Sequence, residues 1–349
     1  MVSTAEPVVP PKLRPGDTVR VVTPSRSRAM VLEHDHSTLI EARFADLGLR
    51  LSYGEHVDER DVFDSSSVAS RVADLHAAFA DPDVQAVLTV IGGFSSNELL
   101  PYLDWELIRA NPRIFCGYSD ITALQNATLA RCDLITYSGP HWSTFGMRDH
   151  LEQTLDWFVQ TLFTQAPVEL TAAATWTDDL WFLDQDDRCP RPNEGWWALR
   201  PGTAAGRIVG GNLCTFNLLQ GTPYRPSLAG ALLVVEDDYL TFPAEFARNL
   251  TSLLQLPDAA GITGLVVGRF QRESGMTRAL LEQVLDHQDL PAGIPVLANV
   301  DVAHTQPMAT LPIGGQAELT VPPASDPARP GSGPVEPGTP GARFRITRH

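Results

Sequence analysis

Short apolar runs rich in β-branched residues alternate with helix-forming stretches through the first half of this chain. The runs cover residues 18–23, 50–53, 86–91 and 113–116, and Gly, Pro or Ser follows each of them closely. The stretches between them carry apolar residues at helical spacing, ending near residue 47 and spanning 68–79 and 99–110. Strands that alternate with helices are joined by crossovers, which build a parallel sheet with helices on both faces. The alternation therefore predicts an α/β fold.

The length of the chain predicts two domains. At about 100–200 residues per domain, 349 residues provide two hydrophobic cores. We expect an N-terminal α/β domain over residues 1–165 and a second α/β domain over 204–349, with strands at 231–235, 264–267 and 294–300. The alternating segments 317–321 and 343–347 predict a terminal hairpin. Between them, 322–341 is rich in Pro, Gly and Ser, and we expect a flexible loop because this composition buries too little apolar surface to fold.

Residues 166–203 interrupt the alternation of strands and helices. They contain four of the seven tryptophans, Trp176, Trp181, Trp196 and Trp197, among aspartates and prolines and without clear periodicity. A long aperiodic segment is either a linker or a functional loop. Because linkers rarely carry four tryptophans, we interpret 166–203 as an active-site loop.

Charge and cysteine content exclude several classes of function. The chain has 26 Lys and Arg against 42 Asp and Glu, and this net charge of −16 argues against a nucleic-acid polymer as partner. No apolar run reaches the roughly 18–20 residues of a membrane-spanning helix, and the polar, proline-rich N-terminus differs from a secretory signal. The four cysteines are widely spaced without a CxxC pair. We therefore expect a cytoplasmic protein with no disulfide framework, no zinc site and no membrane partner.

The strongest local signal for chemistry is the segment RIFCGYSDITALQNATLA, residues 113–130. A short apolar strand runs into Gly-Tyr-Ser-Asp and then into a helix. A serine on such a turn has an exposed hydroxyl, and the amides beside it favour negative charge on an attacked carbonyl oxygen. Two interpretations stay open from this stretch alone, because Ser119 or Asp120 also serves as an ordinary helix cap.

A serine nucleophile needs a base and an acid that orients it, and each has one candidate at the end of an expected strand. Glu236 follows the apolar run of LLVVEDD, and His304 lies in the loop VDVAHTQPMATLPIG, which Pro307 and Pro312 constrain. The chain order serine, acid, histidine is that of other α/β hydrolases. A structural role for a lone histidine remains the alternative.

The turn IGGFSSN, residues 91–97, follows an expected strand and precedes a helix. It matches neither GxGxxG nor the phosphate-binding GK[ST] pattern. Two consecutive glycines allow a substrate to approach the backbone closely, so Gly92 or Gly93 is a candidate for the second amide donor to an oxyanion. A simple tight turn is the alternative.

Four motifs in this order resemble one family: IGGFSSNELLPYLDWELIRANPRIFCGYSDITAL, GRIVGGNL, LLVVEDD and HTQPMATLPIG. They are similar to the serine carboxypeptidases of the LD-carboxypeptidase class, over about residues 13–321. The resemblance implies a flavodoxin-like N-terminal domain, a swivelling-type C-terminal domain, no cofactor and a homodimer. It also implies a catalytic triad of Ser119, Glu236 and His304, with oxyanion donors at the amides of Gly93 and Asp120.

The family has two main branches, which differ in substrate. One removes the terminal D-alanine from murein tetrapeptides, and the other, the microcin C self-immunity proteins, cuts peptidyl or aminoacyl groups from a nucleotide moiety. The tryptophan-bearing segment resembles the second branch, and a purine offers a flat face on which an aromatic ring stacks. Candidates for substrate binding are therefore Gly92, Trp176, Trp181, Trp196 and Arg188.

Four alternatives stay open at this point, two for the roles of side chains and two for the function. The tryptophans also fit a packing role between domains or at a dimer interface, and Arg188 also fits pairing with the aspartates around it rather than with a phosphate. The murein branch is the second choice for the reaction. A nucleotide binder without catalysis is the third, and it would use the turn at Gly92 and Gly93.

Overall fold

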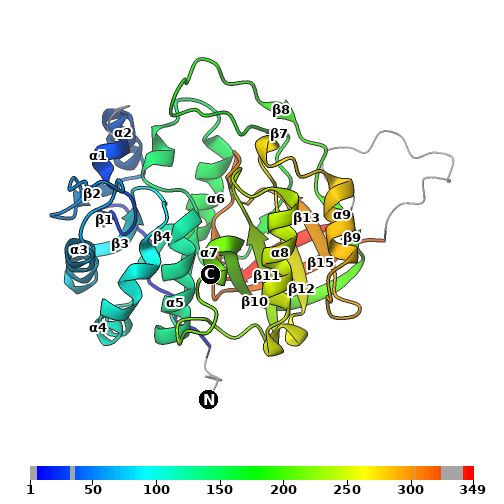
Figure 1. The fold of residues 1–349 in the computed structure, drawn as a ribbon. Helices are drawn as coiled ribbons and strands as arrows, with labels where there is room; N and C mark the ends of the chain where they lie inside the picture. Colours follow the sequence, from blue (N-terminus) through cyan, green and yellow to red (C-terminus); the bar gives the residue numbers. More distant parts are fainter. Residues whose placement is uncertain (1–5, 32–35, 303, 324–340) are drawn as a thin grey trace.

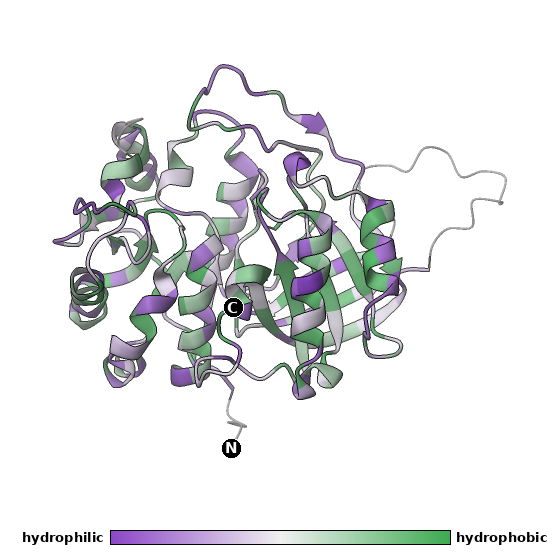
Figure 2. Cartoon of the chain, in the orientation of Figure 1, coloured by the Kyte–Doolittle hydropathy of each residue, from purple (hydrophilic) through white to green (hydrophobic). Residues whose placement is uncertain are grey.

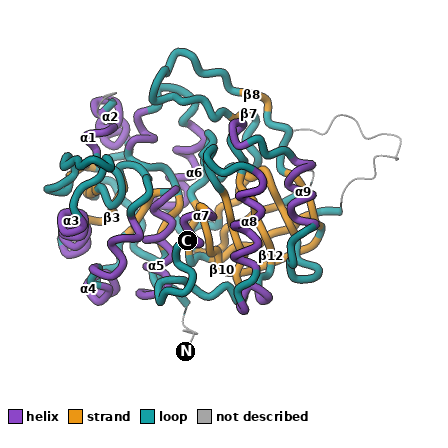
Figure 3. Tube along the Cα trace, in the orientation of Figure 1, coloured by secondary structure: helices purple, strands orange, loops and turns teal. Residues whose placement is uncertain are grey.

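A computed structural model describes residues 6–31, 36–302, 304–323 and 341–349. Two sheets, of six and eight strands, lie side by side, and helices surround them (Figures 1 and 3). The strands of the two sheets are mostly hydrophobic, and the helices around them carry both hydrophilic and hydrophobic residues (Figure 2). The predicted α/β class with two domains is confirmed. Most of loop 322–341, from residue 324 to 340, lies outside the described residues.

The first sheet forms the N-terminal half of the molecule. Its parallel strands are β1 (Thr18–Val22), β2 (Arg50–Tyr53), β3 (Val84–Thr89), β4 (Ile114–Gly117) and β5 (Thr136–Ser138), in the order β2-β1-β3-β4-β5. This is the flavodoxin-like order, in which ligands bind beyond the carboxyl ends of the strands. A strand from the far end of the chain, β14 (Leu311–Ile313), pairs antiparallel with β5. The loop that carries His304 is thereby tied to the first sheet.

The second sheet has a parallel centre with antiparallel edges. β10 (Gly202–Asn212), β11 (Ala231–Glu236), β12 (Gly264–Gly268) and β13 (Val296–Val300) run parallel. The predicted terminal hairpin is present, because β15 (Gln316–Val321) and β16 (Arg343–Arg348) pair antiparallel beside β10. The helices are α1 (Arg28–Val31), α2 (Ser37–Asp46), α3 (Val68–Ala80), α4 (Trp105–Ala110), α5 (Thr122–Cys132), α6 (Glu152–Phe163), α7 (Leu213–Asn217), α8 (Pro243–Leu254) and α9 (Arg278–Asp286).

Two expected elements differ in the structure. The single helix expected over 99–110 is a 3₁₀ turn, η2 (Ser96–Tyr102), followed by α4, because the Asp104 side chain accepts from the Leu107 amide and starts a new helix. The aperiodic segment 166–203 contains four short strands, β6 (Val168–Leu170), β7 (Thr175–Trp176), β8 (Arg191–Pro192) and β9 (Trp197–Arg200). Strands of two to four residues are too short to show a period.

The ends of that segment belong to the second sheet, where β6 pairs with β16 and β9 with β13. Its middle arches over the carboxyl ends of the strands, with β7 and β8 at the top of Figure 1. Among the described residues, no helix is both long enough and apolar enough to cross a membrane.

Candidate active site

Ser119 lies at a sharp turn between β4 and the helix α5. Its φ is +62°, a left-handed conformation that costs a serine about 1–2 kcal/mol. A 3₁₀ turn over Ser119–Ile121 leads into α5, and the N-cap position of α5 is Ile121, without a capping side chain. Neither Ser119 nor Asp120 is therefore an ordinary helix cap. The strained turn presents the serine at the carboxyl end of the sheet.

The carboxylate of Asp120 fixes this turn against two neighbouring loops. It is buried, and its Oδ2 accepts hydrogen bonds from Ser25 Oγ at 2.6 Å and from the Ser96 amide at 2.8 Å. Ser96 Oγ in turn donates to the Asp120 carbonyl at 2.6 Å. The loops after β1, β3 and β4 thus meet at one carboxylate, which supports the strained backbone of Ser119.

Gly92 lies directly against the serine. A Cβ at this position would lie 2.8 Å from Ser119 Cβ and 3.0 Å from Ser119 Oγ, which is too close for any side chain. At Gly93 a Cβ would lie 2.3 Å from Ser25 Oγ. The two glycines therefore bring the backbone of the β3 turn up to Ser119 and Asp120, in the region where the oxyanion donors are expected.

The second sheet supplies the acid and the histidine. Glu236 ends β11, and His304 lies in the loop between β13 and β14. His304 Nδ1 is 2.8 Å from Glu236 Oε2, and their side chains are 15% and 6% exposed. Burial alone lowers the pKa of His304, but the charge and hydrogen bond of Glu236 outweigh it and raise that pKa above its ordinary value. The structure thus brings together two residues that lie 68 positions apart.

Two aromatic residues connect the histidine to the serine turn, and neither is predicted as a site residue from the sequence. The ring of Tyr118 meets His304 edge-on, with 5.1 Å between centroids, and stacks on His141 at 4.0 Å. His141 is buried, and burial lowers its pKa to about 3. It is therefore a neutral support for Tyr118. The one available signal is the position of Tyr118 immediately before the serine.

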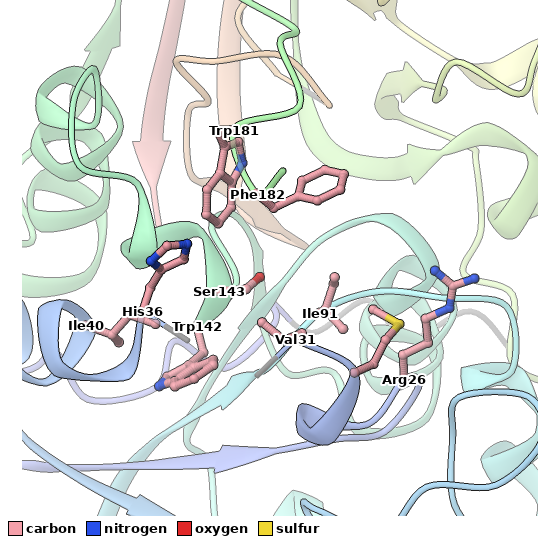
Figure 4. Close-up of a pocket in the computed structure, with 10 residues that line it drawn as sticks. Arg26, Val31, His36, Ile40, Ile91, Trp142, Ser143, Trp181 and Phe182 are labelled. Atoms are coloured by element: carbon pink, nitrogen blue, oxygen red, sulfur yellow. The ribbon is translucent and has the colours of Figure 1, made fainter. Parts of the chain in front are cut away.

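An apolar pocket of about 190 Å³ opens beside the Gly92 turn (Figure 4). Trp181 and Phe182 enter it from the arching segment, and the opposite wall includes Ile40, Val31 and Ile91. Trp142, Ser143, Met30, His36 and Arg26 complete the lining. The Arg26 amide donates to the Gly92 carbonyl at 3.3 Å, so the pocket adjoins the turn that contacts Ser119.

The other candidates for substrate binding on the segment have structural contacts. Trp196 is 4% exposed, and its indole N–H donates to Asp301 Oδ2 at 2.9 Å. The Cζ atom of Arg269 lies over the ring of Trp176, 5.2 Å from the ring centroid. Arg188 donates to the carbonyl of Asp149. Trp196 therefore faces the core and not a ligand, because its expected stacking role would need an exposed ring face.

Three aspartates of the segment pair with arginines outside it. Arg272 bonds Asp178 Oδ1 at 2.5 Å and Asp179 Oδ1 at 2.9 Å, and Arg148 pairs with Asp186. Both ends of the arch are thus attached, one to the second sheet's loops and one to the loop before α6. Each of these three aspartates thus faces an arginine.

Family models match both halves of the chain. The LD-carboxypeptidase N-terminal domain matches residues 19–139, and the LD-carboxypeptidase C-terminal domain matches residues 205–319. The chain belongs to the LD-carboxypeptidase family. This membership confirms the resemblance seen in the sequence and supports a hydrolase of the serine-peptidase type.

Relatives in this family come from both branches. The chain is 44% identical to the protein YocD of Bacillus subtilis over 88% of this chain and 94% of the relative. It is 30% identical to the murein tetrapeptide carboxypeptidase of Pseudomonas aeruginosa, over 70% of this chain and 79% of the relative. It is 29% identical to the microcin C7 self-immunity protein MccF of Escherichia coli, over 90% and 93%.

Solved structures of the LD-carboxypeptidase family share the fold over nearly the whole chain. An MccF-like protein from Bacillus anthracis superposes with a TM-score of 0.90 at 41% identity, covering 98% of this chain and 100% of that one. MccF in complex with aspartyl sulfamoyl adenosine superposes with a TM-score of 0.83 at 26% identity, covering 98% and 99%. These likenesses agree with the two-sheet architecture described above.

Proposed function

We propose that this protein is a serine hydrolase that cuts the amide bond between an aminoacyl or peptidyl group and a nucleotide moiety. Ser119 is the nucleophile, His304 the base and Glu236 the acid that orients it. The observation that carries the proposal is the Glu236–His304 pair beside the strained turn of Ser119, with the aromatic pocket adjoining it.

Each proton transfer has a donor and an acceptor in this geometry. Because Nδ1 of His304 faces Glu236, the other ring nitrogen, Nε2, is left to accept the proton of Ser119 Oγ as that oxygen attacks the substrate carbonyl. The amides of Gly93 and Asp120 stabilise the oxyanion that forms. His304 then gives its proton to the leaving nitrogen, and the amide bond breaks to leave an acyl-enzyme. Water, deprotonated by His304, hydrolyses the ester and restores Ser119.

Glu236 stabilises the protonated imidazole during both steps. It raises the pKa of His304, so the histidine takes a proton more readily than an isolated imidazole does. Tyr118 keeps the ring in place from the side.

The pocket favours a nucleotide as the leaving part of the substrate. Trp181 offers an aromatic face in a mainly apolar lining, and stacking of a base on an aromatic ring contributes about 1–3 kcal/mol. MccF, a member of the same family, is seen with glutamyl sulfamoyl guanosine and with aspartyl sulfamoyl adenosine. Trp181 is therefore the residue of the segment that we assign to the base.

Removal of a terminal D-alanine from murein tetrapeptides is the second candidate, favoured by the identity to a murein tetrapeptide carboxypeptidase. A nucleotide binder without catalysis is disfavoured, since binding alone gives no reason for a strained serine beside a histidine–glutamate pair. The expected homodimer remains a prediction that sedimentation velocity measures.

A side-by-side assay tests the proposal. Purified protein is incubated with an aminoacyl sulfamoyl adenosine and, separately, with a murein tetrapeptide, and products are separated by chromatography. We expect release of the sulfamoyl nucleoside, at least about 10³-fold slower with Ser119→Ala. Trp181→Ala should raise the KM about tenfold, because one stacked face is lost. Cleavage of the tetrapeptide alone would overturn the substrate assignment, and full activity of Ser119→Ala would overturn the nucleophile.

A further inference from the structure

A buried carboxylate lies at the root of the loop that carries His304. Asp301 follows β13 directly and is 1% exposed. Its Oδ1 is 2.8 Å from Arg269 Nη1, and the Arg269 side chain is 2% exposed. Its Oδ2 accepts from the Trp196 indole at 2.9 Å and from the Ala173 amide at 3.3 Å. Both carboxylate oxygens therefore have partners. Oδ1 pairs with Arg269, which directly follows β12, and Oδ2 accepts from two residues of the tryptophan-bearing segment.

The neighbouring Asn299 completes this cluster. It has a left-handed φ of +57°, its Oδ1 accepts from Arg269 Nε at 3.1 Å, and its Nδ2 donates to the Gly195 carbonyl at 2.7 Å. Asp301 therefore holds the Trp196 side chain, and Asn299 holds the backbone of the residue before it. A buried ion pair brings little net stability, because the two ions lose their hydration. Here the ion pair instead fixes the orientation of the end of β13, which leads to His304.

The same segment holds the loop of His304 a second time. The amides and carbonyls of Thr177 and Gln306 exchange two hydrogen bonds of 2.8 Å each. The loop's base is closed by the Ala309 amide, which donates to the Asp301 carbonyl at 2.7 Å. His304 therefore lies on a loop pinned at Asp301, at Gln306 and at Ala309, and two of these three residues contact the tryptophan-bearing segment.

We propose that this segment braces the catalytic histidine: Asp301 is a positioning residue for His304, and the indole N–H of Trp196 fixes Asp301. The role of His304 as base rests on the proposed function. The tryptophan-bearing segment then has two roles. Trp181 lines the ligand pocket, while Trp196 and Thr177 hold the loop on which the histidine lies.

The chain offers a matched pair of variants. Trp196→Phe keeps an aromatic ring in the core and removes the donor to Asp301. Trp197→Phe removes an indole N–H that donates, at 2.8 Å, to the exposed Glu194. Asp301→Asn is a poorer probe, because it leaves Arg269 buried without its counter-charge. Thermal melting checks that both phenylalanine variants are folded.

Two readouts separate a positioning role from a structural one. The first is the rate at which a fluorophosphonate labels Ser119, which needs the base but no natural substrate. We expect about a tenfold loss in Trp196→Phe and less than twofold in Trp197→Phe, since small displacements of a base slow attack by this order. The second is the proton NMR titration of the His304 imidazole, assigned with His304→Gln. Its pKa should move down in Trp196→Phe, because the pair with Glu236 loosens.

Each outcome decides the matter. Equal labelling rates and equal His304 titrations in the two variants would overturn the brace. If Ser119 of the wild-type protein is not labelled but the His304 titration moves only in Trp196→Phe, the brace stands and the proposed function falls. A tenfold labelling defect with a shifted titration supports both.

Discussion

The surroundings of the proposed triad, which we call the candidate edge, and the tryptophan-bearing segment (166–203) are both acidic, but they hold their charges in opposite ways. On the segment, Asp178, Asp179 and Asp186 pair with arginines at the molecule's surface. At the candidate edge, Glu236 faces His304, and Asp237 is 1% exposed with Oδ1 accepting from Asn212 Nδ2 at 3.2 Å. Burial and the Glu236 charge raise the pKa of Asp237 to about 7.

The comparison distinguishes aspartates that attach one segment to another from buried carboxylates whose pKa is shifted. An aspartate paired with a surface arginine stays ionised and holds two pieces of chain together. A carboxylate buried beside another carboxylate has a perturbed pKa, which is a common property of functional sites. Net charge alone therefore says little about the ligand, because three aspartates of the segment already face arginines.

The largest predicted effect concerns Asp237. Its folded-state pKa of about 7 exceeds the unfolded value of about 3.9, so between these pH values the folded protein holds the extra proton. This contribution to stability is complete below pH 4 and is lost as the pH rises to 7. At about 1.4 kcal/mol per pKa unit, the loss is on the order of 4 kcal/mol.

Asp237→Asn removes this proton and keeps an oxygen for Asn212. The free energy of unfolding of the variant minus that of the wild type should therefore increase steadily from pH 4 to pH 7. Urea denaturation at several pH values measures this difference. Asp83→Asn, at an exposed position, is the control. A difference between Asp237→Asn and the wild type that stays constant with pH would contradict the prediction.

The second prediction tests how rigid the candidate edge is. Gly92 is not among the residues with positive φ, so its backbone tolerates alanine, but the new Cβ would lie 2.8 Å from Ser119 Cβ. We expect Gly92→Ala to slow the labelling of Ser119 about 100-fold, because the serine must move.

Gly16→Ala is the reverse case. Gly16 has a φ of +98° and open space around it, so alanine there should lower stability by about 1 kcal/mol and leave labelling unchanged. Labelling and thermal melting of the two variants measure this contrast. If Gly92→Ala labels at the wild-type rate, the turn is less tightly packed than the structure indicates.

The two regions also differ in what the sequence predicts. The serine turn, Glu236 and His304 each follow a recognisable apolar strand, and parallel strands bring their carboxyl ends to one edge of a sheet. Strand patterning therefore places all three at the ends of strands, and it is the resemblance to the family that selects them as a triad, because each alone also fits a structural role. On the segment, Trp181 and Trp196 are indistinguishable by neighbours or spacing.

Their different surroundings come from long-range side-chain pairs. Trp196 meets Asp301, 105 residues away, and Arg272 meets Asp178, 94 residues away. Such pairs leave no local period, and the strands on which they depend have two to four residues. Likewise, the support of Tyr118 by His141 arises only when the loop after β5 folds back beside β4.

The smallest predicted effect breaks the attachment of the segment. Arg272 is 43% exposed, so Arg272→Met should lower stability by about 0.5–1 kcal/mol, less in high salt, because exposed pairs are screened. Burial opposes the shift, but hydrogen bonds from Thr177 and Cys189, together with Arg272, lower the pKa of Asp179 below its ordinary value. The contribution is therefore present above pH 4 and is lost as the pH falls through the folded-state pKa of Asp179. Urea denaturation at pH 7 and at acid pH measures it.

The same variant tests whether this attachment matters for the ligand pocket. Arg272→Met should raise the KM a few-fold, because Trp181 loses a fixed anchor on one side. Arg278→Met breaks the exposed Arg278–Glu282 pair on α9 and serves as the control, with wild-type binding of the aminoacyl sulfamoyl adenosine. An unchanged KM in Arg272→Met would mean that the arch keeps its place without Arg272.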